Sequence, residues 1–136
     1  MRKSILTILL TLCLSFYLMS CTESGEDTAK SMIQTLEDAG YVIESQDSEA
    51  IDSFMAHILL DGYSINATIS ALYIGYINEN ERWVQLIVFE NKDLAAIYIQ
   101  ALYDEQVSGR LSYVSGYVVM ITYSQETVDL FEIFQN

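Results

Sequence analysis

The chain of 136 residues contains no proline, a single histidine and two cysteines. Without proline, its turns must be made by glycine, asparagine, aspartate and serine. One histidine, His57, provides too little material for a Ser-His-Asp triad or for a zinc site with several histidine ligands. The six glycines are scattered singly, so no glycine-rich loop is available for a phosphate group. These absences exclude several catalytic and cofactor-binding classes.

Basic residues are also few, with six Lys and Arg against nineteen Asp and Glu and a formal net charge of −13. Phosphate backbones repel such a surface, and a nucleic-acid partner is therefore not expected. Most carboxylates stand near predicted helix ends, where solvated charges are common, and no segment has the ligand spacing of an EF-hand. We expect no catalytic residue, no cofactor and no metal. A hydrolase built on paired carboxylates is the less favoured alternative.

The first twenty residues have the pattern of a secretory signal. Arg2 and Lys3 precede an apolar run over 5–19, and the small residue Ser20 precedes Cys21. A membrane-spanning helix usually needs about 20 predominantly apolar residues, whereas this run is shorter and is interrupted by Thr, Cys and Ser. A cleaved signal is therefore favoured over a permanent transmembrane anchor.

The end of this segment, Leu18-Met19-Ser20-Cys21, resembles the lipobox of bacterial lipoprotein precursors. The resemblance implies removal of residues 1–20 as a lipoprotein signal peptide and attachment of a diacylglycerol to the thiol of Cys21. It also implies that fatty acids such as palmitate often acylate the new N-terminus. The protein would then be exported and anchored by lipid to the bacterial cell membrane or outer membrane. The resemblance covers only residues 1–21, and the mature domain resembles no family.

Processing at Cys21 changes the chemistry of what remains. Cys13 is discarded and Cys21 is acylated, so no free thiol is left for nucleophilic catalysis. The processed chain then contains four basic and nineteen acidic residues, which gives a formal net charge of −15. Anionic lipid headgroups repel such a domain. The acyl chains, and not electrostatic attraction, are therefore expected to hold the protein at the membrane.

Residues 21–27 are predicted to form a short tether, and residues 28–136 a single small domain. Apolar residues at helical spacing predict four helices in this domain. The first helix is expected at roughly 26–39, with Gly40 at its end, and the second begins at the capping residue Ser48 and ends at Gly62. The third and fourth helices are expected to be capped by Asn91 and Ser124. His57 lies on the second helix, one step off its apolar stripe, and is expected at the surface.

Between these helices the pattern is that of strands. A strand is predicted at 41–44, a hairpin turns at 78–81, and a second strand pair turns near 115–116. The interior order β-α-β-β-α-β is that of ferredoxin-like, split βαβ folds. We therefore expect an α+β domain with helices packed on one face of a mainly antiparallel sheet. An N-terminal helix and a C-terminal hairpin and helix would be additions to this core.

Tyrosine is the one unusual enrichment, with nine remaining after processing. Tyr73 and Tyr76 fall on opposite faces of one predicted strand, and Trp83 lies on the next strand. If helices cover one face only, the other face exposes aromatic side chains, which are favoured in binding interfaces. In the alternative interpretation these tyrosines lie at the core boundary with hydrated hydroxyl groups.

The predicted function is that of a non-enzymatic binding or interaction module at the cell envelope. Its partner is expected to be another protein, bound through a sheet edge or through the face around Tyr73, Tyr76 and Trp83. The alternative is an accessory subunit of an envelope assembly, such as a transport or secretion system.

Overall fold

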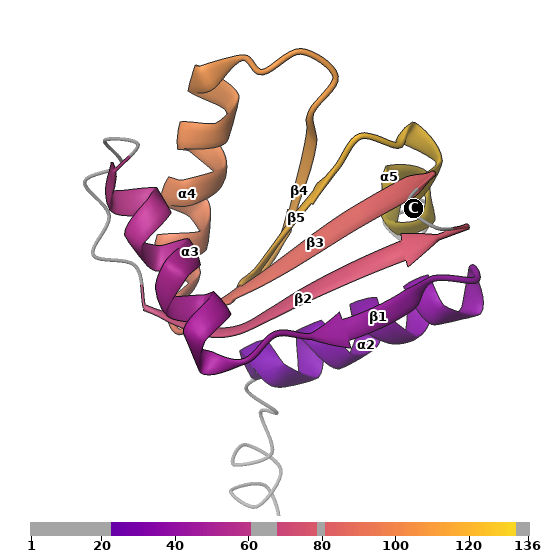
Figure 1. Ribbon diagram of the computed structural model, residues 1–136, viewed down its shortest axis with the longest axis horizontal. Coiled ribbons are helices and arrows are strands. Elements are labelled where there is room, and N and C mark those ends of the chain that lie inside the picture. The colour runs from indigo at the N-terminus through magenta and orange to yellow at the C-terminus, as the bar shows by residue number, and fades with distance from the viewer. Residues whose placement is uncertain (1–22, 61–67, 79–80, 133–136) are drawn as a thin grey trace, which may run out of the picture.

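The computed structural model describes residues 23–60, 68–78 and 81–132 (Figure 1). The helices and strands follow one another in the predicted order, and the α+β class is confirmed. The elements are α2 (Gly25–Asp38), β1 (Val42–Ser45), α3 (Ser48–Leu60), β2 (Ile69–Ile77), β3 (Arg82–Phe89), α4 (Lys92–Glu105), β4 (Leu111–Ser115), β5 (Val118–Thr122) and α5 (Gln125–Glu132).

Five strands form one sheet in the order β1-β2-β3-β5-β4. Each neighbouring pair is antiparallel, which confirms the predicted antiparallel sheet. The predicted hairpins are β2 with β3 and β4 with β5, although part of the first turn, at 79–80, lies outside the described residues. The strands β1 and β4 form the two edges, and β3 lies at the centre.

This strand order differs from the ferredoxin-like arrangement. A split βαβ unit places another strand between the two strands that its helix connects. Here β1 and β2, which stand on either side of α3, are direct antiparallel neighbours, with Val42 opposite Tyr76 and Ser45 opposite Tyr73. The helix therefore joins adjacent strands without crossing over. The order of elements along the chain was compatible with both pairings and did not distinguish between them.

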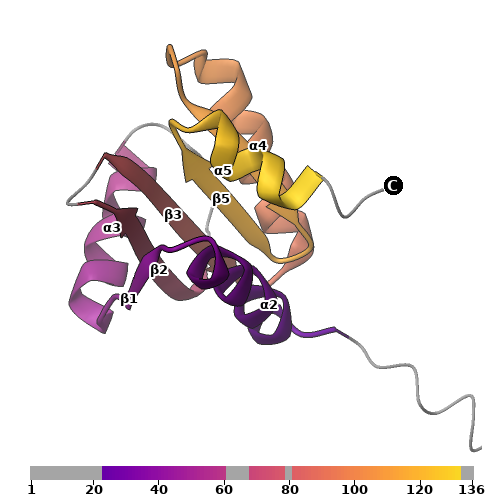
Figure 2. The ribbon, with the colours of Figure 1, turned by 90° about the vertical axis from the view of Figure 1, so that its right-hand side faces the viewer.

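The helices cover both faces of the sheet, so the expectation of helices on one face was wrong. Figure 2 shows α2 and α5 on one side, and α3 and α4 lie on the other. The reason lies in the central strands, where Leu86 and Val88 pack toward α2 and α5 while Ile87 and Phe89 pack toward α3 and α4. Every residue of β5 is buried. Strands with two apolar faces require cover on both.

Local capping explains where most helices begin and end. Ser24 and Asp27 form a capping box at the start of α2, so this helix begins inside the segment expected to be a tether. The hydrogen bond with Ser24 lowers the pKa of Asp27. Gly40 follows the helix at φ +96°, as the predicted helix end requires. Asn91 caps α4 as expected.

The second helix is capped one residue earlier than predicted. The carboxylate of Asp47 accepts a hydrogen bond from the Ala50 N–H at 2.9 Å, so Asp47 and not Ser48 fills this role. Gly62, the expected end of this helix, lies outside the described residues. Ser124 accepts a hydrogen bond from the Thr127 N–H at the start of α5, as predicted.

Candidate functional site

The structure separates the three aromatic residues that the sequence grouped into one surface. Tyr73 packs on the α2 side of the sheet, where it lines a small hollow of about 240 Å³ together with Glu26 and Ala29 of α2. Tyr76 and Trp83 lie on the opposite face, as direct partners across β2 and β3. The sequence predicted the opposite orientations of Tyr73 and Tyr76 correctly. It did not predict that Trp83 would pair with Tyr76.

Two further side chains extend this pair into a row across the sheet. Val42 of β1 stands opposite Tyr76, and the ring centroid of Tyr123, just after β5, lies 6.3 Å from that of Trp83. Val42 and Tyr123 are 54% and 58% exposed, whereas Tyr76 and Trp83 are half-buried. We call Val42, Tyr76, Trp83 and Tyr123 the aromatic row.

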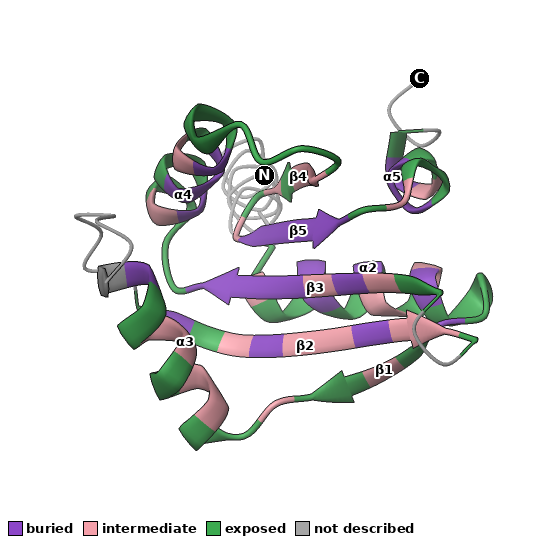
Figure 3. Ribbon diagram, turned by 45° about the horizontal axis from the view of Figure 1, so that its top comes forward, coloured by how far each residue is buried: buried purple, intermediate pink, exposed green. Residues whose placement is uncertain are grey.

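The aromatic row is open because the described helices cover the other end of this face. The helices α3 and α4 pack over residues such as Leu72, Ile87 and Val119, which lie farther along the same strands. Figure 3 shows these two helices at one end of the sheet and the opposite ends of β2 and β3 uncovered toward the viewer. The sheet therefore extends beyond its helical cover on this face.

Uncompensated charge around the aromatic row is negative. Arg82 pairs with Glu126 at 2.5 Å, Arg110 with Glu105 at 2.7 Å, and Lys30 with Glu26 at 2.8 Å. The fourth basic residue after Cys21, Lys92, lies over the Tyr117 ring at 5.1 Å from the centroid. All four cations are thus engaged within the domain. The carboxylate of Glu44, two residues from Val42, lies on the same face as the aromatic row.

Glu44 also sets the ionisation of one member of the aromatic row. The Tyr76 hydroxyl donates a hydrogen bond to Glu44 Oε1 at 2.8 Å. This hydrogen bond, together with the negative charge of the carboxylate, raises the pKa of Tyr76. The favourable effect is complete below the ordinary pKa of tyrosine and is lost as the pH rises through the raised value.

We expect the Glu44→Gln substitution to lower the pKa of Tyr76 toward its ordinary value, because an uncharged amide does not oppose formation of the tyrosinate. A titration followed by the ¹³Cζ chemical shift of Tyr76 measures this change. Glu37→Gln removes one charge from the end of α2 and is the matched control. It is expected to leave the pKa of Tyr76 unchanged. An unchanged midpoint in Glu44→Gln would contradict the coupling.

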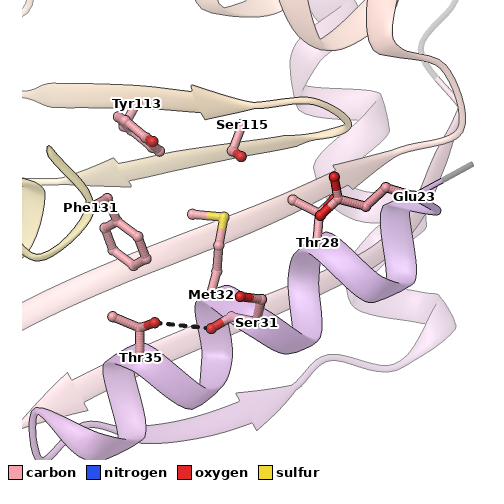
Figure 4. A pocket seen from close by; sticks show the side chains of 8 residues that line it. All are labelled: Glu23, Thr28, Ser31, Met32, Thr35, Tyr113, Ser115 and Phe131. Atoms are coloured by element: carbon pink, nitrogen blue, oxygen red, sulfur yellow. Dashed lines mark hydrogen bonds between the residues drawn. The ribbon is translucent and has the colours of Figure 1, made fainter. Parts of the chain in front are cut away.

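The opposite face carries a cleft that the sequence did not indicate. The cleft has a volume of about 350 Å³ and lies between α2, β4 and α5 (Figure 4). Its lining combines hydroxyl groups, apolar side chains and one carboxylate. The residues that line it are Glu23, Thr28, Ser31, Met32, Thr35, Tyr113, Ser115 and Phe131.

Periodicity on two elements builds this cleft. Thr28, Ser31 and Thr35 recur at helical spacing along α2, while Tyr113 and Ser115 alternate onto one face of β4. Phe131 of α5 stacks on Tyr113 with ring centroids 5.7 Å apart and an interplanar angle of 28°. From sequence, the three hydroxyl residues fit a solvated helix face. Only the approach of α2 to β4 and α5 encloses them.

The structure also places the single histidine and several of the tyrosines. His57 lies exposed on α3, at the surface position that its place off the apolar stripe indicated. Tyr41 and Tyr98 are buried, and the hydroxyl groups of Tyr41 and Thr127 share a buried hydrogen bond. Among the described residues, no cluster of three or more His, Cys, Asp or Glu side chains is placed to hold a metal ion. In the same residues, no helix has the length and apolar character needed to cross a membrane.

Comparison with known proteins gave no further assignment. No protein-family model, no curated protein and no solved structure matches this chain significantly.

Proposed function

We propose that the protein is a lipid-anchored bacterial envelope protein whose domain binds a protein partner and catalyses no reaction. The lipobox over Leu18–Cys21 supports the anchor, and the aromatic row supports the binding role. The observation that carries the proposal is the contiguous Tyr76, Trp83 and Tyr123 surface, in which Trp83 packs on the edge of the core beneath α3 and α4 and Tyr123 is exposed. Such a surface leaves apolar area in water that a partner would bury.

The chemistry of the aromatic row suits a protein interface. Tyrosine and tryptophan offer large contact areas and lose little side-chain entropy on binding, and both are enriched among residues that dominate binding energy. The Tyr76 hydroxyl is held by Glu44, so this ring is already oriented. Because the four basic residues are engaged within the domain, the free charge is acidic. A partner with an apolar patch and a basic rim is complementary to it.

The position of the aromatic row relative to the anchor also favours this role. Ser24, which caps the start of α2, is three residues beyond the proposed lipidated Cys21 in the sequence. From there the 14 residues of α2 extend about 21 Å at 1.5 Å per residue. Val42 follows the far end of α2 and belongs to the aromatic row. Val42 is therefore separated from the proposed anchor by about the length of α2, and the aromatic row lies on the sheet face opposite that helix.

Photocrosslinking in cells of the native host tests the binding face. We expect a photoreactive phenylalanine analogue at Tyr123 to give one discrete adduct, because this ring is exposed within the aromatic row. The same analogue at Ile97, which is 53% exposed on α4, is expected to give none. Trp83→Ala should reduce the Tyr123 adduct several-fold, while the control Tyr103→Ala, at an exposed tyrosine outside the row, should not. Equal adducts at positions 97 and 123 would contradict the proposal.

A further inference from the structure

We propose that the cleft between α2, β4 and α5 binds a neutral saccharide of one or two sugar rings. Its volume of about 350 Å³ lies within the usual range for small-molecule sites, roughly 300–1,000 Å³. The cleft and the aromatic row lie on opposite faces of the sheet, so this site is separate from the proposed protein interface.

Hydroxyl groups from both sides of the cleft, three on α2 and one on β4, can donate and accept hydrogen bonds. The Thr28 and Thr35 hydroxyls donate to the Ser24 and Ser31 carbonyls at 3.2 and 3.1 Å, so both keep lone pairs for a ligand donor. Ser31 and Ser115 supply two more hydroxyl groups. Ligand alcohols also donate and accept, and therefore match these hydroxyl groups better than ligand groups that only donate.

Three other lining residues are apolar or aromatic: Met32, which lies on α2 among the hydroxyl residues, half-buried Tyr113 on β4 and buried Phe131 on α5. The rings of Tyr113 and Phe131 stack, and Met32 lies beside them in the cleft (Figure 4). A sugar ring has one face rich in C–H groups, which carry partial positive charge and pack against the negative face of an aromatic ring. The opposite edges of the sugar carry its hydroxyl groups. The hydroxyl groups and the aromatic side chains of the cleft thus offer the two kinds of contact that a saccharide makes.

Charge and polarity disfavour the other ligand classes. The ionisable side chains in the lining are Glu23 and Tyr113, so the lining itself holds no cation to offset a phosphate or carboxylate, and Lys92, near Gly116 at one end of the cleft, lies over the Tyr117 ring. An ammonium ligand would pair with Glu23 but has no acceptor for the hydroxyl donors of Ser31 and Ser115. A purely hydrocarbon ligand would strip water from the hydroxyl groups without replacing their hydrogen bonds. A neutral polyhydroxylated ligand avoids all three costs.

The proposed lipidation places the cleft near the membrane, because Glu23 is two residues beyond Cys21. The saccharide could therefore be free or could be the headgroup of a glycolipid. This distinction rests on the proposed anchor, whereas the ligand chemistry does not.

Methionine-methyl NMR of the processed lipoprotein in a detergent without sugar tests the site. Three methionines remain after processing: Met32 lines the cleft, while Met55 and Met120 lie outside it. We expect maltose or N,N′-diacetylchitobiose to shift the Met32 methyl signal saturably and to leave the other two signals in place. A dissociation constant on the order of 1 mM is expected for a small ligand in an open cleft.

Matched variants and probes decide the outcome. Glu23→Gln should weaken sugar binding about three- to tenfold, since it removes a charged hydrogen-bond acceptor, while Glu37→Gln, outside the cleft, should not. An unchanged Met120 signal, from a fully buried residue, verifies that each variant is folded.

Vesicles that contain a glucosyl diacylglycerol, compared with phosphatidylcholine vesicles, distinguish a headgroup from a free sugar. A Met32 shift with inorganic phosphate or spermidine but not with either sugar, or no shift with any probe, would overturn the proposal.

Discussion

Replacement of Cys21 by alanine is expected to abolish lipid attachment and to release the protein from the membrane fraction. In the proposed precursor the thiol of Cys21 carries the diacylglycerol, and alanine offers no nucleophile for that transfer. The net charge of −15 that the domain carries after processing repels anionic headgroups, so electrostatic attraction does not replace the lipid. Loss of one thiol should therefore change the location of the whole protein.

Membrane fractionation combined with metabolic palmitate labelling measures this effect. Cys13→Ala is the matched control, since Cys13 lies in the segment proposed to be removed and should affect neither label nor location. A Cys21→Ala protein that stayed in the membrane fraction and still incorporated palmitate would exclude the lipobox interpretation. Because the aromatic row and the cleft lie in the folded domain, their binding can be tested whatever this outcome.

Phe89→Ala is expected to lower the free energy of unfolding by about 3–5 kcal/mol, the usual cost of removing a buried phenyl ring. Phe89 ends the central strand β3 and is 1% exposed. Its ring centroid lies 5.4 Å from that of Tyr98, so it connects the sheet to α4. The substitution removes apolar burial and this ring contact, and it leaves a cavity. The loss is a large share of the roughly 5–15 kcal/mol that stabilises a typical domain.

Urea denaturation of the two proteins measures the difference in unfolding free energy. Ile97→Ala is the control on α4, the helix that carries Tyr98. Ile97 is 53% exposed, so its truncation should change the free energy of unfolding by less than about 0.5 kcal/mol. If both substitutions cost the same, Phe89 would not be part of the core as described.

The helix positions and most helix ends of this protein were predictable, because they depend on residues close together in the sequence. The stripe of Ala29, Met32 and Leu36 predicted α2, and Gly40 predicted its end. Asn91 predicted the start of α4 in the same way. These signals act over one or two turns of chain, so they do not require knowledge of the rest of the fold. The one displaced cap, Asp47 in place of Ser48, is an error of a single position between two residues that both favour caps.

The sheet arrangement depended on contacts between distant segments. Both the split βαβ order and the observed β1-β2-β3-β5-β4 order agree with the same sequence of elements. The run Val118–Thr122 has apolar residues at successive positions, so side chains on both faces of this strand need to be covered. This run therefore indicates that helices pack on both faces of the sheet. The period-2 pattern placed Tyr73 and Tyr76 on opposite faces, but the register across β2 and β3 decided that Tyr76 meets Trp83.

The sequence alone thus determined the α+β class, the helix and strand order and the acidic charge, and it is the source of the proposal that Cys21 carries a lipid anchor. Each of these follows from composition or from patterns within a short stretch of chain. Only the tertiary structure decided which side chains share a surface. The aromatic row draws on three strands and the residue after a fourth, and the cleft joins α2 to β4 and α5, segments about 80 to 100 positions apart in the chain. Such sites arise from strand register and helix packing, which no local pattern encodes.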